Sequence, residues 1–299
     1  MKAKFTFSTI VGLTLLLVLS RTAPGMAANG MLIQQLDSGC VNWSIGIVRV
    51  NGIAAPVDSD DSELPGQLSG RLDAARRMAE SNLLQTVNAI RINAVSRVAD
   101  RAARNPDFQE GLVALARNAP ITRQEYLSDG TVEIELTMKL TGGFGQFVLP
   151  EEIRQVDSVV TMSSAMPDAN QPPARTDGAE GGPYTGLIID ATGIGAAPSL
   201  VPVVVDESEE VVYGPAFVSR EFAVSSGMSG FATTLAAARS HKRVGDHPLV
   251  IKALRTRSTG KTDIVVSKTD AARLRSSVVH LNFLKACRVS IVMDLKPDP

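Results

Sequence analysis

The segment 121–140 constrains the fold of this chain more than any other stretch. Runs 121–127 and 132–140 are strand-like and flank Asp129-Gly130, a dipeptide typical of a two-residue hairpin turn. The second run alternates apolar and polar residues along its whole length. Because successive side chains of a strand point to opposite faces, one face of this hairpin is expected to be packed and the other to face water. The apolar face consists of Val132, Ile134, Leu136, Met138 and Leu140.

Helices are expected before the hairpin. Residues 68–92 carry apolar side chains at helical spacing and predict one long amphipathic helix, which would cover the apolar face of the hairpin. Asn105 can cap a second helix that begins at Pro106 and runs to about Arg117. Segment 43–50 is rich in β-branched residues and predicts a strand, ending at a turn at Asn51-Gly52. The glycine-rich segment 142–145 is interpreted as a flexible exit from the hairpin.

The carboxy-terminal half mixes strands with helices. The patterns predict strands at 187–190, 201–205, 211–213, 217–224, 249–255, 263–266 and 287–293, and helices at 231–241 and 270–281. Residues 163–183 are rich in proline and glycine and predict a linker. The sequence therefore predicts an α+β fold of two mixed lobes with independent cores, an amino-terminal domain at 28–162 and a carboxy-terminal α/β domain at 184–299. Each lobe is expected to contain a largely antiparallel sheet with helices packed on it.

The first 27 residues have the features of a cleaved signal peptide. Lys2 and Lys4 precede an apolar run at 10–19, and small residues surround the cleavage point after Ala27. We therefore expect an exported protein, periplasmic or in the outer envelope, with an uncleaved amino-terminal anchor as the alternative. The mature chain contains no apolar run long enough to predict a transmembrane segment.

Charge and cysteine content limit the function further. The 30 basic and 31 acidic residues are interspersed, which gives no footprint for nucleic acid. The two cysteines, Cys40 and Cys287, could form a disulfide in an oxidising compartment, and two separate buried thiols fit the sequence equally well.

Three motifs partly match known functional sites, but none of the matches is complete. Gly193-Ile194-Gly195 resembles a dinucleotide-binding turn, but the residues that follow are β-branched and broken by proline, so no helix can begin there. The acidic segment 206–210 is interpreted as a solvated turn rather than a calcium loop. Ser229 stands in a sequence similar to a nucleophile elbow, with His241, His247 and His280 as the histidines that could serve as its base. We expect no catalytic, cofactor-binding or metal-binding residues, and a serine hydrolase using Ser229 is the enzymatic alternative.

The amino-terminal helix with its run 74–79, followed by the hairpin ending at 133–142, resembles the domain shared by small bacterial envelope lipoproteins and the amino-terminal part of flagellar assembly protein T. Segments 184–191, 211–214 and 283–289 are similar to an extension of exported members of that group. The chain departs from the lipoprotein pattern, because Cys40 lies far beyond the apolar leader and has no usable lipobox.

The resemblance implies a non-enzymatic protein that acts through protein-protein contacts, as an accessory of flagellar or envelope assembly. Its expected partners are envelope proteins, including flagellar or secretion assembly components. A small-ligand-binding module in the carboxy-terminal lobe is a further alternative.

Overall fold

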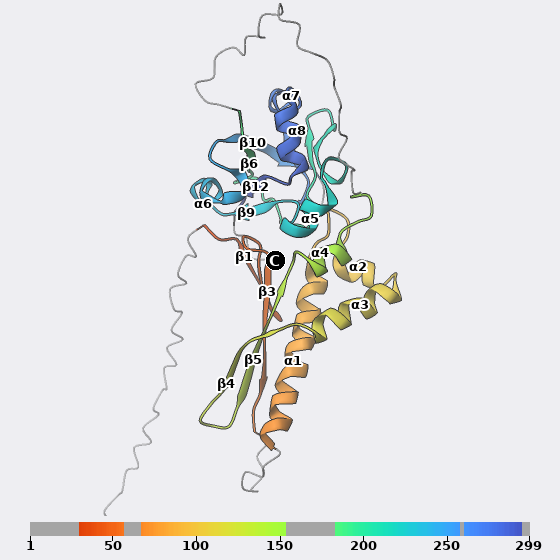
Figure 1. Ribbon diagram of the computed structural model, residues 1–299, viewed down its shortest axis with the longest axis vertical. Coiled ribbons are helices and arrows are strands. Elements are labelled where there is room, and N and C mark those ends of the chain that lie inside the picture. The colour runs from red at the N-terminus through yellow and green to blue at the C-terminus, as the bar shows by residue number, and fades with distance from the viewer. Residues whose placement is uncertain (1–29, 57–66, 154–182, 258–259, 295–299) are drawn as a thin grey trace, which may run out of the picture.

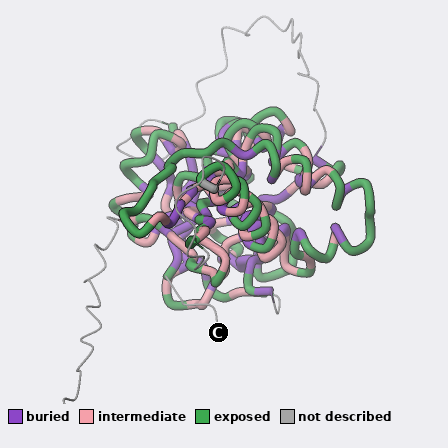
Figure 2. The backbone as a smooth tube through the Cα atoms, turned by 90° about the horizontal axis from the view of Figure 1, so that it is seen from below, coloured by how far each residue is buried: buried purple, intermediate pink, exposed green. Residues whose placement is uncertain are grey.

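A computed structural model describes residues 30–56, 67–153, 183–257 and 260–294. The described residues form two lobes, each built on its own sheet with helices packed against it, which confirms the predicted α+β class (Figure 1). The predicted signal peptide and all but the last residue of the predicted linker 163–183 lie outside the described residues. Buried segments gather on the inside of the molecule and the exposed turns lie around them (Figure 2).

The amino-terminal lobe is a five-stranded antiparallel sheet with helices on one side. The strand order is β1-β2-β3-β5-β4. The strands are β1 (Ile33–Leu36), β2 (Gly39–Asn42), β3 (Ile47–Ala54), β4 (Ile121–Tyr126) and β5 (Val132–Lys139). The helices are α1 (Gln67–Ala89), α2 (Val98–Ala102), α3 (Pro106–Arg117) and α4 (Gly143–Val148).

The predicted hairpin is confirmed, and a helix covers its second strand, whereas β4 is exposed along its whole length. β4 and β5 pair across the Asp129-Gly130 turn, and the apolar residues of β5 from Val132 to Leu136 are buried while their polar neighbours are less so. The long helix α1 lies along β3 and β5, as Figure 1 shows, with Leu83 fully buried between them. Alternation along one strand therefore located both the sheet and the helix that protects it.

Strand β3 does not end at Asn51-Gly52, so the predicted turn there is wrong. Gly52 lies within β3 opposite Ile134, and a Cβ atom at this position would lie 2.0 Å from the carbonyl oxygen of Ala75 on α1. The glycine thus lets the helix backbone approach the strand directly, which is the other common reason for glycine within a strand.

The second predicted helix is confirmed and the glycine-rich exit is not. α3 begins at Pro106, and the Asn105 side chain accepts a hydrogen bond from the Phe108 amide. Segment 142–145 is not a loop, because helix α4 begins at Gly143. The i and i+4 side chains Phe144 and Val148 are both buried, and their burial stabilises a helical turn that the glycines alone would disfavour.

The carboxy-terminal lobe contains a seven-stranded mixed sheet with the order β8-β7-β11-β10-β6-β12-β9. Its strands are β6 (Gly186–Asp190), β7 (Val204–Asp206), β8 (Val211–Tyr213), β9 (Gly230–Ala232), β10 (Pro248–Thr256), β11 (Ile264–Val266) and β12 (Val289–Val292). The expectation of a largely antiparallel sheet is wrong for this lobe, since β6 pairs in parallel with β10 and β12, and β12 in parallel with β9.

Burial on both faces explains the parallel arrangement. Ile188 and Val292 pack with Ala238 on one face of the sheet, whereas Leu187, Ile189 and Ile291 join the main core on the other. Strands covered on both faces are apolar without alternation, which is typical of parallel sheets. The strand runs were visible in the sequence, but their direction depends on the connections between them.

Four helices accompany this sheet: α5 (Arg220–Ser226), α6 (Leu235–Ser240), α7 (Lys268–Arg275) and α8 (Val278–Lys285). Three predictions are corrected here. Segment 217–224 contains helix α5 rather than a strand, because Gly227 ends a helical turn whose Ala223 is buried. Segment 231–241 begins as strand β9 before α6, and the predicted helix 270–281 is two helices because Ser277 caps a new one.

The two lobes share one continuous core rather than the independent cores predicted. Trp43 meets Phe231 edge to face, with ring centroids 5.5 Å apart, and the Ser44 hydroxyl donates to the Phe231 carbonyl at 2.6 Å. Backbone amides of Gly142 and Val201 donate across the joint to Val224 and Ile92. The contacts of Trp43 and Ser44 join the edge strand β9 to the turn between β2 and β3, and buried residues form one cluster across both lobes.

Within the described ranges, no helix combines the length and apolar character needed to cross a membrane.

The packing of α1 predicts a position-dependent loss of stability. Leu83→Ala should lower the free energy of unfolding by about 2–5 kcal/mol, because it leaves a cavity between α1 and the sheet. Leu68→Ala on the same helix should have little effect, since Leu68 is 49% exposed. Urea unfolding followed by circular dichroism measures both. Equal losses for the two variants would contradict the placement of α1.

Candidate functional site

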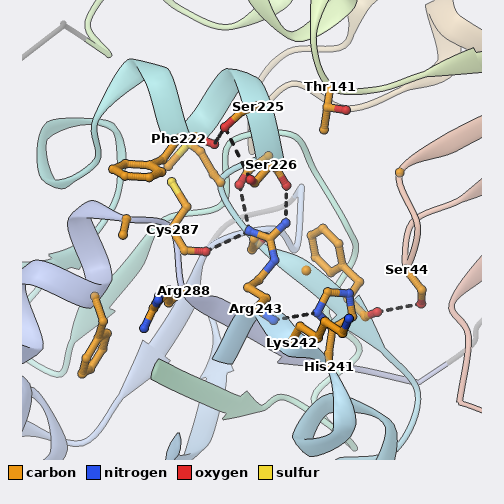
Figure 3. Close-up of a pocket in the computed structure, with 18 of the residues that line it drawn as sticks. Ser44, Thr141, Phe222, Ser225, Ser226, His241, Lys242, Arg243, Cys287 and Arg288 are labelled. Carbon is orange, nitrogen blue, oxygen red and sulfur yellow. Dashed lines mark hydrogen bonds between the residues drawn. The ribbon is translucent and has the colours of Figure 1, made fainter. Parts of the chain in front are cut away.

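A groove of about 1040 Å³ lies where the two lobes meet. The turn 43–46 and residues Leu140 and Thr141 contribute the wall from the amino-terminal lobe. The opposite wall consists of residues 225–231, residues 241–243 and the end of α8 with the residues after it. In Figure 3, Ser44 and Thr141 lie on elements of the first lobe and face the cluster around Arg243.

The side chain of Arg243 is the centre of the second wall. Its Nη1 donates to the carbonyl oxygens of Gly227 at 3.0 Å and Cys287 at 2.8 Å, and its Nη2 donates to that of Ser226 (Figure 3). Ser226 and Gly227 end helix α5, and Cys287 follows the end of α8. The guanidinium therefore satisfies carbonyls that helix C-termini leave without partners, where the helix dipoles also favour a cation.

Burial and neighbouring groups affect the ionisation around Arg243. Burial lowers the pKa of Arg243, and the acidic groups of Tyr213 and Cys287 act in the opposite direction. Burial also raises the pKa of Tyr213 well above its usual value. Tyr213 is fully buried and its hydroxyl donates to the Met228 carbonyl, so the carbonyls of three successive residues, 226–228, are bound by side-chain donors.

Gly227 allows this chain reversal. Its backbone has φ +76° and ψ 155°, a region that glycine alone occupies readily. Cys287, two residues after α8 ends, also has a left-handed backbone conformation, with φ +55°. The amide of Arg288 donates to Phe283 and that of Cys287 to Leu284, the hydrogen bonds of a Schellman motif, in which glycine is the usual residue.

The rim of the groove carries further polar side chains. Lys242 and Arg288 are exposed, and His241 accepts a hydrogen bond at Nδ1 from the Arg243 amide at 3.1 Å. Burial, followed by the charge of Arg243, lowers the pKa of His241. His241 is therefore neutral at pH 7, and because Nδ1 accepts, Nε2 carries the proton and is a donor.

Three large apolar side chains that line the groove are exposed. Ile45 of the first lobe is 52% exposed, and Phe222 on α5 and Val279 on α8 are 41% and 44% exposed. Large apolar residues gathered in a concave surface indicate a binding site more often than residues scattered singly.

The structure places Ser229 in the groove without a catalytic partner. Helix α5 precedes Ser229 and strand β9 follows it, the reverse of the strand-turn-helix order of a nucleophile elbow. The buried Oγ atom of Ser229 has no hydrogen-bond partner among the described residues. Of the three histidines, only His241 lines the same groove, and its Nδ1 is bound to the Arg243 amide.

The glycine motif 193–195 lies at the carboxyl end of β6, and no helix follows it before β7 begins at Val204. The Asp190 carboxylate instead accepts hydrogen bonds from the Thr192 hydroxyl at 2.7 Å and from Lys252 at 2.9 Å. Burial alone would raise the pKa of Asp190, but these hydrogen bonds outweigh it and hold the pKa below its usual value. The motif is thus a turn in the sheet, as the sequence indicated.

The acidic segment 206–210 is an ion-paired turn. Asp206 accepts from the amides of Ser208 and Glu210 and from Arg275 at 3.1 Å. Among the described residues, no three or more His, Cys, Asp or Glu side chains form a group that could hold a metal ion. His247 and His280 lie on either side of Tyr184, with ring centroids 5.1 Å and 5.5 Å from it.

Both cysteines are free thiols in the structure, Cys40 half-buried and Cys287 buried. Cys40 lies on β2 beside Arg49 in the first lobe, and Cys287 lies buried beside Tyr213 and Arg243 in the other. Burial raises the pKa of Cys287 to about 11. Burial also raises the pKa of Cys40, where the positive charge of Arg49 acts in the opposite direction.

A second cavity of about 730 Å³ lies elsewhere along the joint, with Ile92, Val201 and Phe217 in its lining. Of its charged lining residues, Arg257 forms an ion pair with Asp263 at 3.1 Å, and Arg101 donates to the Val148 carbonyl at 2.9 Å. The lining of this cavity includes a carboxylate, that of Glu152, whereas the described lining of the first groove includes none.

The carboxy-terminal lobe matches a known bacterial domain family. Residues 186–295 match the sequence profile of the second domain of Treponema pallidum Tp0624. This region covers nearly all of the seven-stranded sheet, from β6 to β12. It also overlaps the segments 184–191, 211–214 and 283–289 that carry the resemblance noted in the sequence. A comparison with curated proteins found no match.

The sequence does not identify Arg243 as a functional residue, because it stands in no recognisable motif. The carbonyl groups that Arg243 binds come from segments 16 and 44 residues away, and no local pattern reports such a contact.

Removing the Arg243 guanidinium should destabilise the protein. Arg243→Met leaves three carbonyl groups without their donor, so we expect the free energy of unfolding to fall by about 3 kcal/mol or more. Lys242→Met, at the exposed neighbouring position, should change it by about 0.5 kcal/mol or less. Urea unfolding measures both. An Arg243→Met protein as stable as wild type would show that these hydrogen bonds do not stabilise the fold.

Thiol reactivity should differ between the two cysteines. At pH 8 in the folded protein, Cys287 should react much more slowly with a disulfide reagent than Cys40, because it is buried and its raised pKa keeps it protonated. In denaturant without reductant, both thiols should react. Cys40→Ser should remove the fast phase. A denatured protein that releases thiols only after reduction would instead establish the bridge.

Proposed function

We propose that this chain is an exported, non-enzymatic protein that acts through protein-protein contacts, with the groove between the lobes as its contact surface. The observation that carries the proposal is the exposure of Ile45, Phe222 and Val279, three large apolar side chains that come from both lobes and line one groove. Burial of such side chains by a partner supplies the main driving force of association.

The fixed geometry of the joint supports this proposal. Arg220 on α5 donates to the carbonyl groups of Gln146 and Pro150 of the first lobe, each at 2.9 Å. Ser44 and Phe231 are hydrogen-bonded across the joint as well. A groove whose walls are already held together loses little conformational freedom when a partner binds, which favours affinity.

The chemistry of the groove favours binding over catalysis. Ser229, its only candidate nucleophile from the sequence, has no base within hydrogen-bonding distance among the described residues. A groove with exposed apolar side chains and no base beside its serine suits a surface that accepts part of another protein.

The cellular setting of the proposal rests on the sequence. The leader at 1–27 supports export to the periplasm or outer envelope, and the resemblance of the amino-terminal helix and hairpin supports a role beside flagellar or envelope assembly. We therefore propose an accessory of such an assembly, with envelope proteins as partners.

Site-specific photo-crosslinking in the source cells tests this proposal. A photoreactive phenylalanine analogue replaces Val279 in one variant and Phe222 in another. Val278, which is adjacent to Val279 and 73% exposed but does not line the groove, is the matched control. We expect the two groove positions to crosslink to the same envelope protein, identified by mass spectrometry, and position 278 to give no such adduct.

Two results would count against the proposal. The first is an equal yield of adducts at all three positions, or a strictly monomeric protein without adducts in every fraction. The second is labelling by a fluorophosphonate probe in wild type that disappears in Ser229→Ala, which would establish the hydrolase instead.

A further inference from the structure

We infer that the groove between the lobes binds an acidic peptide segment of its partner, anchored by apolar side chains. This inference rests on the proposed function and adds the chemistry of the bound segment. Its main observation is the charge of the lining: Lys242, Arg243 and Arg288 line the groove, and no Asp or Glu is among the lining residues. The whole chain, in contrast, has a formal net charge of −1.

The charge of Arg243 is not neutralised by another ion. All its hydrogen bonds go to backbone carbonyls, of Ser226, Gly227 and Cys287, and its Nε has no partner among the described residues. Carbonyl dipoles stabilise a guanidinium but leave its full positive charge in place. In a concave surface with apolar walls, such a charge produces a stronger positive potential than it would on an open surface.

Lys242 and Arg288 add to this potential. Neither forms an ion pair with a carboxylate in the part of the chain that the structure describes; Arg288 has only a long contact, 3.4 Å, with the Thr185 carbonyl. Elsewhere in the same lobe, Arg255, Arg257 and Arg275 form ion pairs with carboxylates. The described lining of the groove contains no carboxylate, and a ligand could supply one.

The shape and the apolar lining select a peptide among anionic ligands. Phe222 and Val279 provide apolar contact area beside the cations, which suits a segment with both acidic and apolar side chains. A membrane surface presents anionic headgroups too, but it cannot enter a groove between two lobes, and membrane association commonly uses an exposed basic amphipathic helix. An extended segment of a protein fits both the shape of the groove and its apolar and cationic lining.

Selection from a phage-displayed library of random peptides, carried out on the mature protein, provides the probe. The enriched peptide is synthesised with a fluorescent label and titrated against wild type and Lys242→Glu/Arg288→Glu. The matched control is Arg239→Glu/Lys268→Glu, which makes the same change in net charge at two exposed positions outside the groove. A second peptide has each Asp and Glu replaced by Asn and Gln.

We expect the enriched peptides to contain Asp or Glu beside large apolar residues. Charge reversal at 242 and 288 should weaken binding at least about tenfold, and the neutralised peptide should lose a similar factor, because like charges replace opposite ones across the contact. The control variant should bind within about twofold of wild type, and rising salt should weaken wild-type binding.

The two proposals fail in different ways. Peptides that need Phe222 and Val279 but are neutral and insensitive to Lys242→Glu/Arg288→Glu would overturn the acidic segment and leave the partner-binding groove intact. Selection that yields no peptide dependent on Phe222 or Val279 would overturn both. Binding that follows net charge alone, with the control variant as weak as the groove variant, would also overturn the inference.

Discussion

Guanidinium groups bind carbonyls at helix ends in both lobes, and that of Arg220 does so across the joint between them. Arg243 does so for α5 and α8, and Arg220 for α4, through the carbonyl of Gln146. Arg101 and Arg76 donate to the last carbonyls of α4 and α3, those of Val148 and Arg117. A helix C-terminus exposes carbonyls without intrahelical partners, and burying it in a joint is costly unless a donor is brought there. Arginine meets that need with several donors and a charge that matches the dipole.

The contacts of helix α5 connect the joint with the groove. Arg220 fixes α5 on the first lobe, and Arg243 fixes the end of α5 to the end of α8. Trp43 and Phe231 are buried and pack edge to face across the joint. The groove is the space that remains between surfaces held in this way. Its walls come from both lobes, so the contact surface exists only when the lobes are joined.

The sequence predicted local structure well wherever one segment carried the whole signal. The hairpin around Asp129-Gly130 was predicted from a turn dipeptide and an alternating strand, and the helix after Asn105 from a capping residue followed by proline. Both are confirmed. Strand direction and the role of Gly52 needed knowledge of a distant partner: the neighbouring strands in one case, the backbone of α1 in the other. The groove likewise depends on contacts between distant segments. Its residues are scattered from Trp43 to Arg288, and each looks ordinary in its own segment.

Arg243 also connects stability with the charge of the groove. Since its hydrogen bonds go to carbonyl groups rather than carboxylates, the side chain that closes the two helix ends leaves an unneutralised positive charge beside the groove. Removing that charge would remove the donors that the helix ends require, so this part of the potential is fixed by the fold. Lys242 and Arg288 have no comparable structural role: they are exposed, and among the described residues the hydrogen bond of the Arg288 side chain to Thr185 is long. The charge of Arg243 thus follows from the way the second lobe closes its helix ends, whereas the rim residues can adjust which acidic segment the groove prefers.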